Sequence, residues 1–212
     1  MLMCWGGFIM VLGTTQKGVY MALTASTMVN LGTQAPEFSL PDVVSGKTIS
    51  LSDYEGKPLL VMFICQHCPF VKHIKGELAL LGKDYLNTDL GIVAISANDA
   101  EKYPADAPES LKAMAIELDL KYSVCYDENQ EVAKAYTAAC TPDFFLFDAE
   151  HKLIYRGQLD SSRPSNSEPV TGKDLRAAIE SVLTGKEIIG DQKPSIGCNI
   201  KWKPGNEPNY VG

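Results

Sequence analysis

The 212-residue sequence predicts an α/β fold, and two features support that prediction. The first is a set of continuous apolar runs, which are typical of strands covered on both faces. The second is a set of segments between these runs in which apolar residues recur every three or four positions, as they do along one face of a helix. Strands and helices therefore alternate along the chain, and they finish with a hairpin and a helix.

The elements of the first half follow in chain order. Residues 36–51 (PEFSLPDVVSGKTISL) contain two β-like runs around Gly46 and predict a hairpin. Residues 59–64 (LLVMFI) form a continuous apolar run and predict a buried strand. A second central strand is predicted at 91–97. The helix between the two strands is predicted by apolar side chains at spacings of three and four, namely Val71, Ile74, Leu78, Leu81 and Tyr85.

The second half continues the alternation. A helix is predicted at about 108–118, with Asp106 and Glu109 as a candidate capping box. The last helix is expected to start at an N-cap residue, Thr171. A strand is predicted at residues 122–126 and a helix at 131–138. A hairpin is predicted from strands at 143–147 and 153–157, and the last helix spans 171–183.

Three segments are expected along the chain. Residues 1–29 are interpreted as an N-terminal extension that is either not native or disordered, because Met21 opens an ordinary start. Residues 30–185 form the folded domain, and residues 186–212 form an irregular tail that packs on it. The apolar run 1–13 is too short to span a bilayer and no Lys or Arg precedes it, which favours a cytoplasmic location. Export through an atypical signal is the alternative.

Charge and cysteine content narrow the function classes. A formal net charge of −7 provides no basic field, so neither nucleic acid nor a membrane surface is an expected partner. Six cysteines in 212 residues are too few for a disulfide scaffold, and only Cys65 and Cys68 have short motif spacing. This usage favours reactive thiols in a reducing compartment.

The pair lies in Cys65-Gln66-His67-Cys68-Pro69, between a predicted buried strand and a predicted helix. A thiol at a helix N-terminus faces unpaired N–H groups and the positive end of the helix dipole, so its pKa falls. We expect Cys65 to be that nucleophilic thiol. Cys68, one turn further and more buried, is then expected to resolve the mixed disulfide. His67 could add to the stabilisation of the thiolate, or it could be a solvent-exposed filler.

The segment before these cysteines (APEFSLPDVVSGKTISLSDYEGKPLLVMF), the motif itself and CTPDFFLFD together resemble the thioredoxin superfamily. The resemblance is closest to its peroxiredoxin-like branch, the alkyl hydroperoxide reductase/thiol-specific antioxidant proteins. It implies a thioredoxin-like fold, with a central mixed sheet flanked by helices, an N-terminal hairpin and the tail. It also implies a cis Thr141–Pro142 bond that faces the cysteines, with backbone that pairs with a substrate chain.

The expected function is thiol–disulfide exchange in redox homeostasis, without a metal or other cofactor. The partners would be protein or small-molecule thiols and disulfides, with a reductase or a low-molecular-weight thiol as electron donor. Peroxidase activity is the first alternative. It ranks behind thiol–disulfide exchange because Met62 replaces the hydroxyl of the peroxiredoxin motif and Pro142 falls on its arginine position, so both groups that would stabilise the peroxide are missing. A non-enzymatic metal-binding or redox-sensing module is the second, since Cys65, Cys68, Cys125 and Cys140 supply four thiols without zinc-knuckle spacing.

Two further cysteines are candidate redox thiols. Cys140 comes two residues before Pro142 and should lie near the site. Cys198 lies between Gly197 and Asn199, where the backbone can turn sharply. A tail that returns across the domain could bring Cys198 within reach of Cys140 or Cys65, and an unpaired tail thiol is the alternative.

Overall fold

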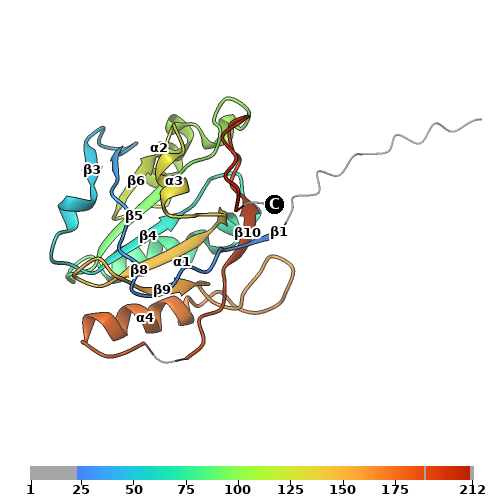
Figure 1. Ribbon diagram of the computed structural model, residues 1–212. Helices are drawn as coiled ribbons and strands as arrows, with labels where there is room; N and C mark the ends of the chain where they lie inside the picture. The colour runs from blue at the N-terminus through green and yellow to red at the C-terminus, as the bar shows by residue number, and fades with distance from the viewer. Residues whose placement is uncertain (1–22, 189, 211–212) are drawn as a thin grey trace, which may run out of the picture.

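The computed structural model describes residues 23–188 and 190–210, and it confirms the predicted thioredoxin-like α/β fold. Its main sheet has five strands in the order β6-β5-β4-β8-β9 (Figure 1). The sheet is mixed, because β4 pairs in parallel with β5 and antiparallel with β8. The strands are β4 (Leu59–Phe63), β5 (Gly91–Ser96), β6 (Ser123–Tyr126), β8 (Asp143–Phe147) and β9 (Leu153–Gly157).

Helices cover both faces of this sheet and explain the continuous apolar run of β4. Side chains alternate along a strand, so Leu60 and Met62 lie on one face and Val61 and Phe63 on the other. The first face packs in one core with α1, α2 and α4, and the second packs in another core with α3. The helices are α1 (Pro69–Asp84), α2 (Pro108–Glu117), α3 (Glu131–Ala135) and α4 (Lys173–Leu183).

The predicted hairpin is confirmed as β2 (Ser39–Pro41) and β3 (Thr48–Ser50), which pair antiparallel. Its turn contains Gly46 with a φ of 71°, a left-handed conformation that glycine adopts without steric cost. The hairpin packs through Phe38 and Leu40 on the core shared with α3. It therefore covers the side of the sheet opposite α1.

A second, three-stranded sheet joins the two ends of the described chain. Its order is β1-β10-β7, formed by β1 (Leu23–Ala25), β10 (Ile196–Asn199) and β7 (Cys140–Thr141), all antiparallel. Figure 1 shows β1 and β10 side by side next to the end of the main sheet.

These strands alter two expectations about the chain ends. β1 belongs to the predicted N-terminal extension, whose residues 1–22 lie outside the described part of the structure, and β10 belongs to a tail predicted to be irregular. Short strands that pair across more than 100 residues leave no periodic signal in the sequence. The boundaries at 29/30 and 185/186 stay a prediction.

Two predicted helix starts are wrong. The N-cap of α4 is Gly172, with a φ of 64°, and not Thr171. The N-cap of α2 is Ala107, and no side chain caps it. The carboxylate of Asp106 is directed elsewhere, to the loop that carries the paired cysteines.

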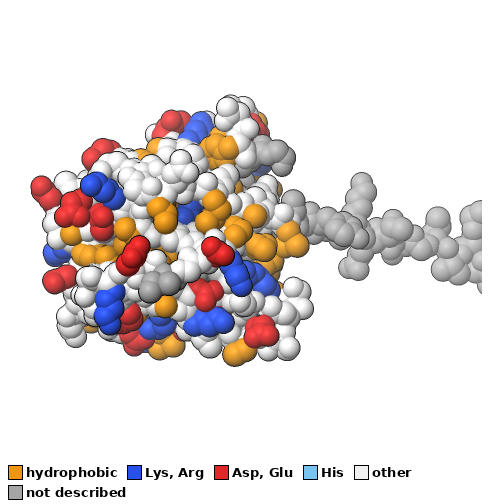
Figure 2. All heavy atoms as spheres, turned by 60° about the horizontal axis from the view of Figure 1, so that its bottom comes forward, with side chains coloured by type: hydrophobic (Ala, Val, Ile, Leu, Met, Phe, Trp, Pro, Cys, Tyr) orange, Lys and Arg blue, Asp and Glu red, His pale blue; other side chains and the backbone are white. Residues whose placement is uncertain are grey.

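The surface mixes charge types. In the face shown in Figure 2, acidic, basic and apolar side chains are interspersed. Among the residues that the structure describes, no helix is both long and apolar enough to cross a membrane. The cytoplasmic location and the absence of a nucleic-acid partner stay predictions.

Candidate active site

The loop between β4 and α1 carries the paired cysteines. β4 lies in the middle of the sheet, and all five of its residues are buried. The chain then turns through residues 64–67 before α1 begins at Pro69. Cys65 and Cys68 are both fully buried, with 0% exposure. A reagent can reach these two thiols only after a movement of the protein that exposes them.

The helix N-terminus belongs to Cys68, and the expectation that it belongs to Cys65 is wrong. Cys68 is the N-cap of α1, with an extended backbone (φ −65°, ψ 124°), and Pro69 is the first helical residue. Proline suits this first position because its missing N–H would have no partner there. The residue before a proline avoids the helical region, so Cys68 must remain outside the helix. Cys65 lies three residues further from the helix.

Electrostatics also favours Cys68 as the thiolate. Hydrogen bonds from the thiols of Cys198 and Cys65 lower its pKa, despite its burial, and the N–H of Val71 in the first turn of α1 contributes. The pKa of Cys65 is raised well above its usual value, first by its hydrogen bond to Cys68, then by burial and by the charge of Asp106. The directions of these two shifts favour Cys68 over Cys65 as the thiolate.

The Thr141–Pro142 peptide bond is cis, and Thr141 contacts both cysteines. The Cys65 Sγ lies 3.2 Å from the Thr141 Oγ1. The thiol form of Cys68 donates a hydrogen bond of 3.1 Å to the Thr141 carbonyl oxygen. Thr141, which is predicted to shape a substrate groove together with Pro142, therefore lies directly against both sulfur atoms.

Asp106 is a site residue that sequence reasoning assigned to a helix cap. It ends a 3₁₀ turn (Pro104–Asp106) and is fully buried. Its carboxylate accepts the backbone N–H groups of Gln66 (2.8 Å) and His67 (3.0 Å), which hold the loop in its turn. It also accepts from the Nδ2 of Asn98 at 2.7 Å and bonds the Nδ1 of His67. Burial raises the pKa of Asp106, but these bonds outweigh burial and the pKa lies below its usual value.

His67 is oriented by Asp106 and not by a thiolate. Its ring stacks on Tyr103, with 5.3 Å between ring centroids, and its Nε2 is buried without a hydrogen-bond partner among the described residues. Among the described residues, the His67 ring makes no hydrogen bond to Cys65 or to Cys68. The predicted role of His67 at a thiolate stays a prediction.

Cys65, His67 and Asp106 could offer three metal ligands, since their ligand atoms lie within 4.8 Å of one another. However, both carboxylate oxygens of Asp106 already accept hydrogen bonds, and one of them bonds the histidine directly. A metal would have to break this network. The arrangement fits a hydrogen-bonded support for the loop better than a metal centre.

The two additional candidate thiols lie in the small sheet. Cys198, with 1% exposure, is paired in β10 with Thr141 of β7, and its Sγ lies 2.8 Å from the Sγ of Cys68. The sequence left two interpretations of Cys198 open, a thiol within reach of Cys65 or Cys140 and an unpaired tail thiol; in the structure it contacts Cys68. The thiol of Cys140 donates to the Pro142 carbonyl at 3.6 Å, and burial raises its pKa well above its usual value. Neighbouring residues of a strand face opposite sides, so Cys140 faces away from the side of Thr141.

Comparisons with known proteins identify several similar chains. A thiol-disulfide oxidoreductase ResA from Bacillus thuringiensis subsp. konkukian (strain 97-27) is 27% identical over 131 residues, which are 62% of this chain and 71% of the relative. The crystal structure of an uncharacterized conserved protein from Geobacillus kaustophilus is 52% identical, with a TM-score of 0.86 over 88% of this chain and 99% of that one. The structure of SMc02350 from Sinorhizobium meliloti 1021 is 46% identical, with a TM-score of 0.84 over 86% of this chain and all (100%) of that one. The AhpC/TSA family matches residues 31–156, more than half of the sequence, and the chain belongs to this family.

Proposed function

We propose that the protein is a thiol–disulfide oxidoreductase in which Cys68 is the nucleophile. The observation that carries the proposal is the position of Cys68: it caps α1, and its sulfur contacts a second thiol and the residue before the cis proline. Thiolates attack disulfides, and a helix N-terminus is where a thiolate is stabilised. The ResA relative carries the same class of activity in its name.

The reaction has two exchange steps. The Cys68 thiolate attacks one sulfur of a disulfide R–S–S–R′, forms a mixed disulfide Cys68–S–S–R and expels R′–S⁻. A second thiol of the protein then attacks the Sγ of Cys68 and expels R–S⁻, so that two thiols of the protein are oxidised and one disulfide is reduced. A dithiol reductase or a low-molecular-weight thiol would restore the reduced protein. We propose that Thr141 and Pro142 hold the substrate beside Cys68.

The test is the reduction of a small aromatic disulfide by the full chain with an excess of a dithiol donor. Cys68→Ser should abolish turnover, because no other thiol at the helix N-terminus can attack. Cys125→Ser is the matched control, since Cys125 is equally buried but lies in β6 in the other core. Turnover by Cys68→Ser at the rate of Cys125→Ser would contradict the proposal.

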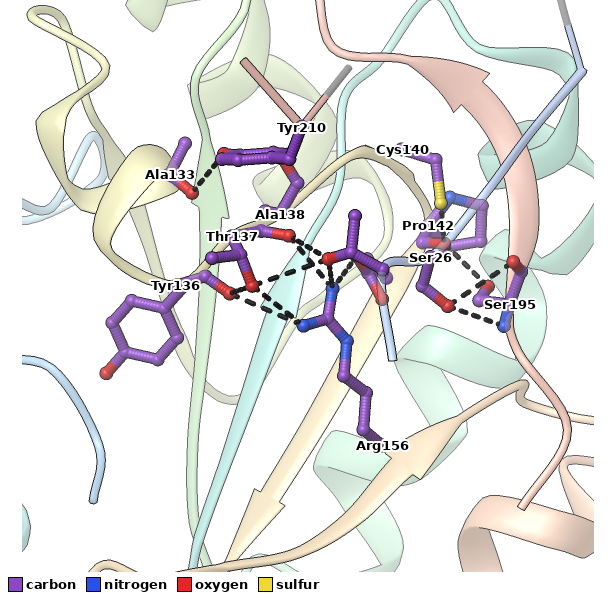
Figure 3. Close-up of polar contacts among 12 residues, drawn as sticks. Ser26, Ala133, Tyr136, Thr137, Ala138, Cys140, Pro142, Arg156, Ser195 and Tyr210 are labelled. Atoms are coloured by element: carbon purple, nitrogen blue, oxygen red, sulfur yellow. Dashed lines mark hydrogen bonds and ion pairs between the residues drawn. The ribbon is translucent and has the colours of Figure 1, made fainter. Parts of the chain in front are cut away.

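Peroxide is the second candidate substrate, because the chain belongs to the AhpC/TSA family and a hydroxyl, that of Thr141, lies beside a cysteine. The buried Arg156 is engaged elsewhere. Its Nη2 donates to Asp143 at 3.1 Å and to Thr27 at 3.0 Å. Its Nη1 donates to the hydroxyl of Thr137 (Figure 3). A guanidinium held by these bonds is not free to donate a hydrogen bond to a peroxide oxygen. We therefore expect hydrogen peroxide to be consumed slowly relative to disulfide reduction.

A further inference from the structure

The C-terminal strand β10 occupies the edge at which a substrate chain would pair. An extended peptide binds an exposed sheet edge by main-chain hydrogen bonds. β7, which precedes the cis proline, offers such an edge, and β10 pairs with it in the register Cys198 to Thr141 and Asn199 to Cys140. A cysteine of the chain itself thus lies where the proposed function places the cysteine of a substrate.

The sulfur positions favour one pairing of thiols. Cys198 and Cys68 face each other with 2.8 Å between their Sγ atoms, whereas a disulfide bond is about 2.05 Å long. The thiol of Cys65 also hydrogen-bonds Cys68, but it has a second partner, the hydroxyl of Thr141 at 3.2 Å. A small shift of β10 or of the α1 N-terminus would therefore bring Cys198 and Cys68 to bonding distance.

The tail is held in this place from both sides. β1 pairs along the other edge of β10, in the register Leu23 to Cys198. The Ser195 hydroxyl donates to the Pro142 carbonyl at 2.7 Å, and the Ser195 N–H donates to the Ser26 hydroxyl at 2.8 Å (Figure 3). Beyond the strand, Trp202 is buried in the core that contains α3. These contacts fix the tail beside the candidate site, so β10 is an integral part of that site.

We infer that Cys198 is the thiol that resolves the mixed disulfide on Cys68, and that the oxidised protein contains a Cys68–Cys198 disulfide which fixes β10 over the edge of β7. The inference rests on the proposed function, since it identifies the second thiol of that reaction. In the step, the Cys198 thiolate attacks the Sγ of Cys68, the new bond is Cys68–Cys198, and the electron pair leaves with R–S⁻. The proton of Cys198 goes to the expelled thiolate or to solvent, and the external dithiol reductant later reduces the new bond.

The charges of the site set the order of these events. While Cys68 is a thiolate, its hydrogen bond with Cys198 keeps Cys198 protonated and raises the pKa of Cys198 above its usual value. Once Cys68 is part of a mixed disulfide, that negative charge is gone and the nearby Lys201 still favours the Cys198 thiolate. Cys198 is thus a protonated, unreactive thiol in the reduced protein, and it becomes a nucleophile after Cys68 has reacted.

Cys68 is fully buried and its Sγ contacts Cys198 of β10, so the substrate must displace β10 before the first step. Return of β10 then delivers Cys198 to the mixed disulfide. This order favours small disulfides or flexible chains, which can enter during a brief opening, over rigid protein surfaces.

The experiment uses the reduced full chain and one equivalent of 5,5′-dithiobis(2-nitrobenzoate), followed by acid quenching, alkylation and peptide mapping. The wild type should release two equivalents of thionitrobenzoate, and its map should contain the Cys68–Cys198 cross-linked peptide. Cys65→Ser should still give the Cys68–Cys198 cross-linked peptide, whatever its rate of release. Cys198→Ser should release one equivalent rapidly and retain the other on Cys68, and Cys125→Ser should behave as the wild type.

A wild-type map that shows a Cys65–Cys68 disulfide with Cys198 alkylated would overturn the inference and leave the proposed function intact. No release of thionitrobenzoate by the wild type, with Cys68 alkylated, would instead reject the proposed function itself. The wild-type map decides between Cys198 and Cys65 even if Cys198→Ser fails to fold, and Cys198→Ala provides a second variant without a polar group in the buried position.

Discussion

Gly197 provides a way to open the site by one substitution. It lies in β10 against β7, and a Cβ at this position would be 2.0 Å from the carbonyl oxygen and 2.6 Å from the carbonyl carbon of Thr141. Even close carbon–oxygen contacts between strands keep about 3.3 Å. Both obstructing atoms belong to backbone, so neither can rotate away. In Gly197→Ala, β10 must therefore move away from β7 by roughly 1 Å.

The cost of this movement sets the size of the effect. Overpacking of a well-packed position costs about 1–3 kcal/mol. If the closed arrangement loses that amount relative to the open one, the open population rises about 5- to 150-fold. Cys68 lies beneath β10, and its labelling should accelerate by the same factor.

The assay follows the labelling of the native reduced protein by a neutral alkylating reagent and quantifies Cys68 and Cys125 separately. In Gly197→Ala, the rate at Cys68 should rise and the rate at Cys125, in the opposite core, should stay unchanged. Gly76→Ala is the matched control, because Gly76 lies in α1 with no atom within 4 Å of the added Cβ. Equal acceleration at both cysteines would mean global unfolding, and no acceleration at Cys68 would mean that β10 does not cover it; either result refutes the reasoning.

Three other perturbations test separate parts of the site. Asp106 has a lowered pKa in the folded state, so it contributes stability that is present above its unfolded pKa of about 3.9 and is lost as the pH falls through the folded value. In urea titrations from neutral to acid pH, Asp106→Asn should lose less unfolding free energy on acidification than the wild type, and identical losses would show that Asp106 is not bonded as described. Trp202→Ala should lower the unfolding free energy by about 3–5 kcal/mol, because a buried aromatic ring leaves a cavity, whereas a change below about 1 kcal/mol would place the tail off the core. Cys65→Ser should keep most of its disulfide reductase activity in steady-state assays, since Cys65 is neither the helix-capping thiol nor the one in contact with β10, and complete loss would return Cys65 to the role of nucleophile or resolver.

Much of the fold could be predicted from local sequence patterns. The run Leu59 to Ile64 identifies a strand covered on both faces, and the spacing of Val71, Ile74 and Leu78 identifies the face that α1 buries. Each of these signals arises because burial selects side chains at the period of the element. β1, β7 and β10 have two to four residues each, which is too short for such a period, and their pairing depends on contacts between distant segments.

The site shows the same limit. The motif Cys65 to Cys68 located the loop of the candidate site, but the helix-capping thiol was assigned to the wrong end of that loop. The signal that could have corrected this was Pro69, because a proline at the first helical position makes the preceding residue the N-cap. Asp106 carried no comparable signal. Its role depends on a 3₁₀ turn that brings it back to a loop 40 residues earlier in the chain.

We propose that Cys68, and not Cys65, carries the thiolate of the site. The most direct measurement treats the fully reduced protein with a limiting amount of iodoacetamide at about pH 6, well below the ordinary thiol pKa of about 8.5, and locates the label by peptide mapping. We predict that the label lies on Cys68 and that Cys65, Cys140 and Cys198 stay unmodified. Label on Cys65, or equal label on Cys65 and Cys68, would contradict the claim.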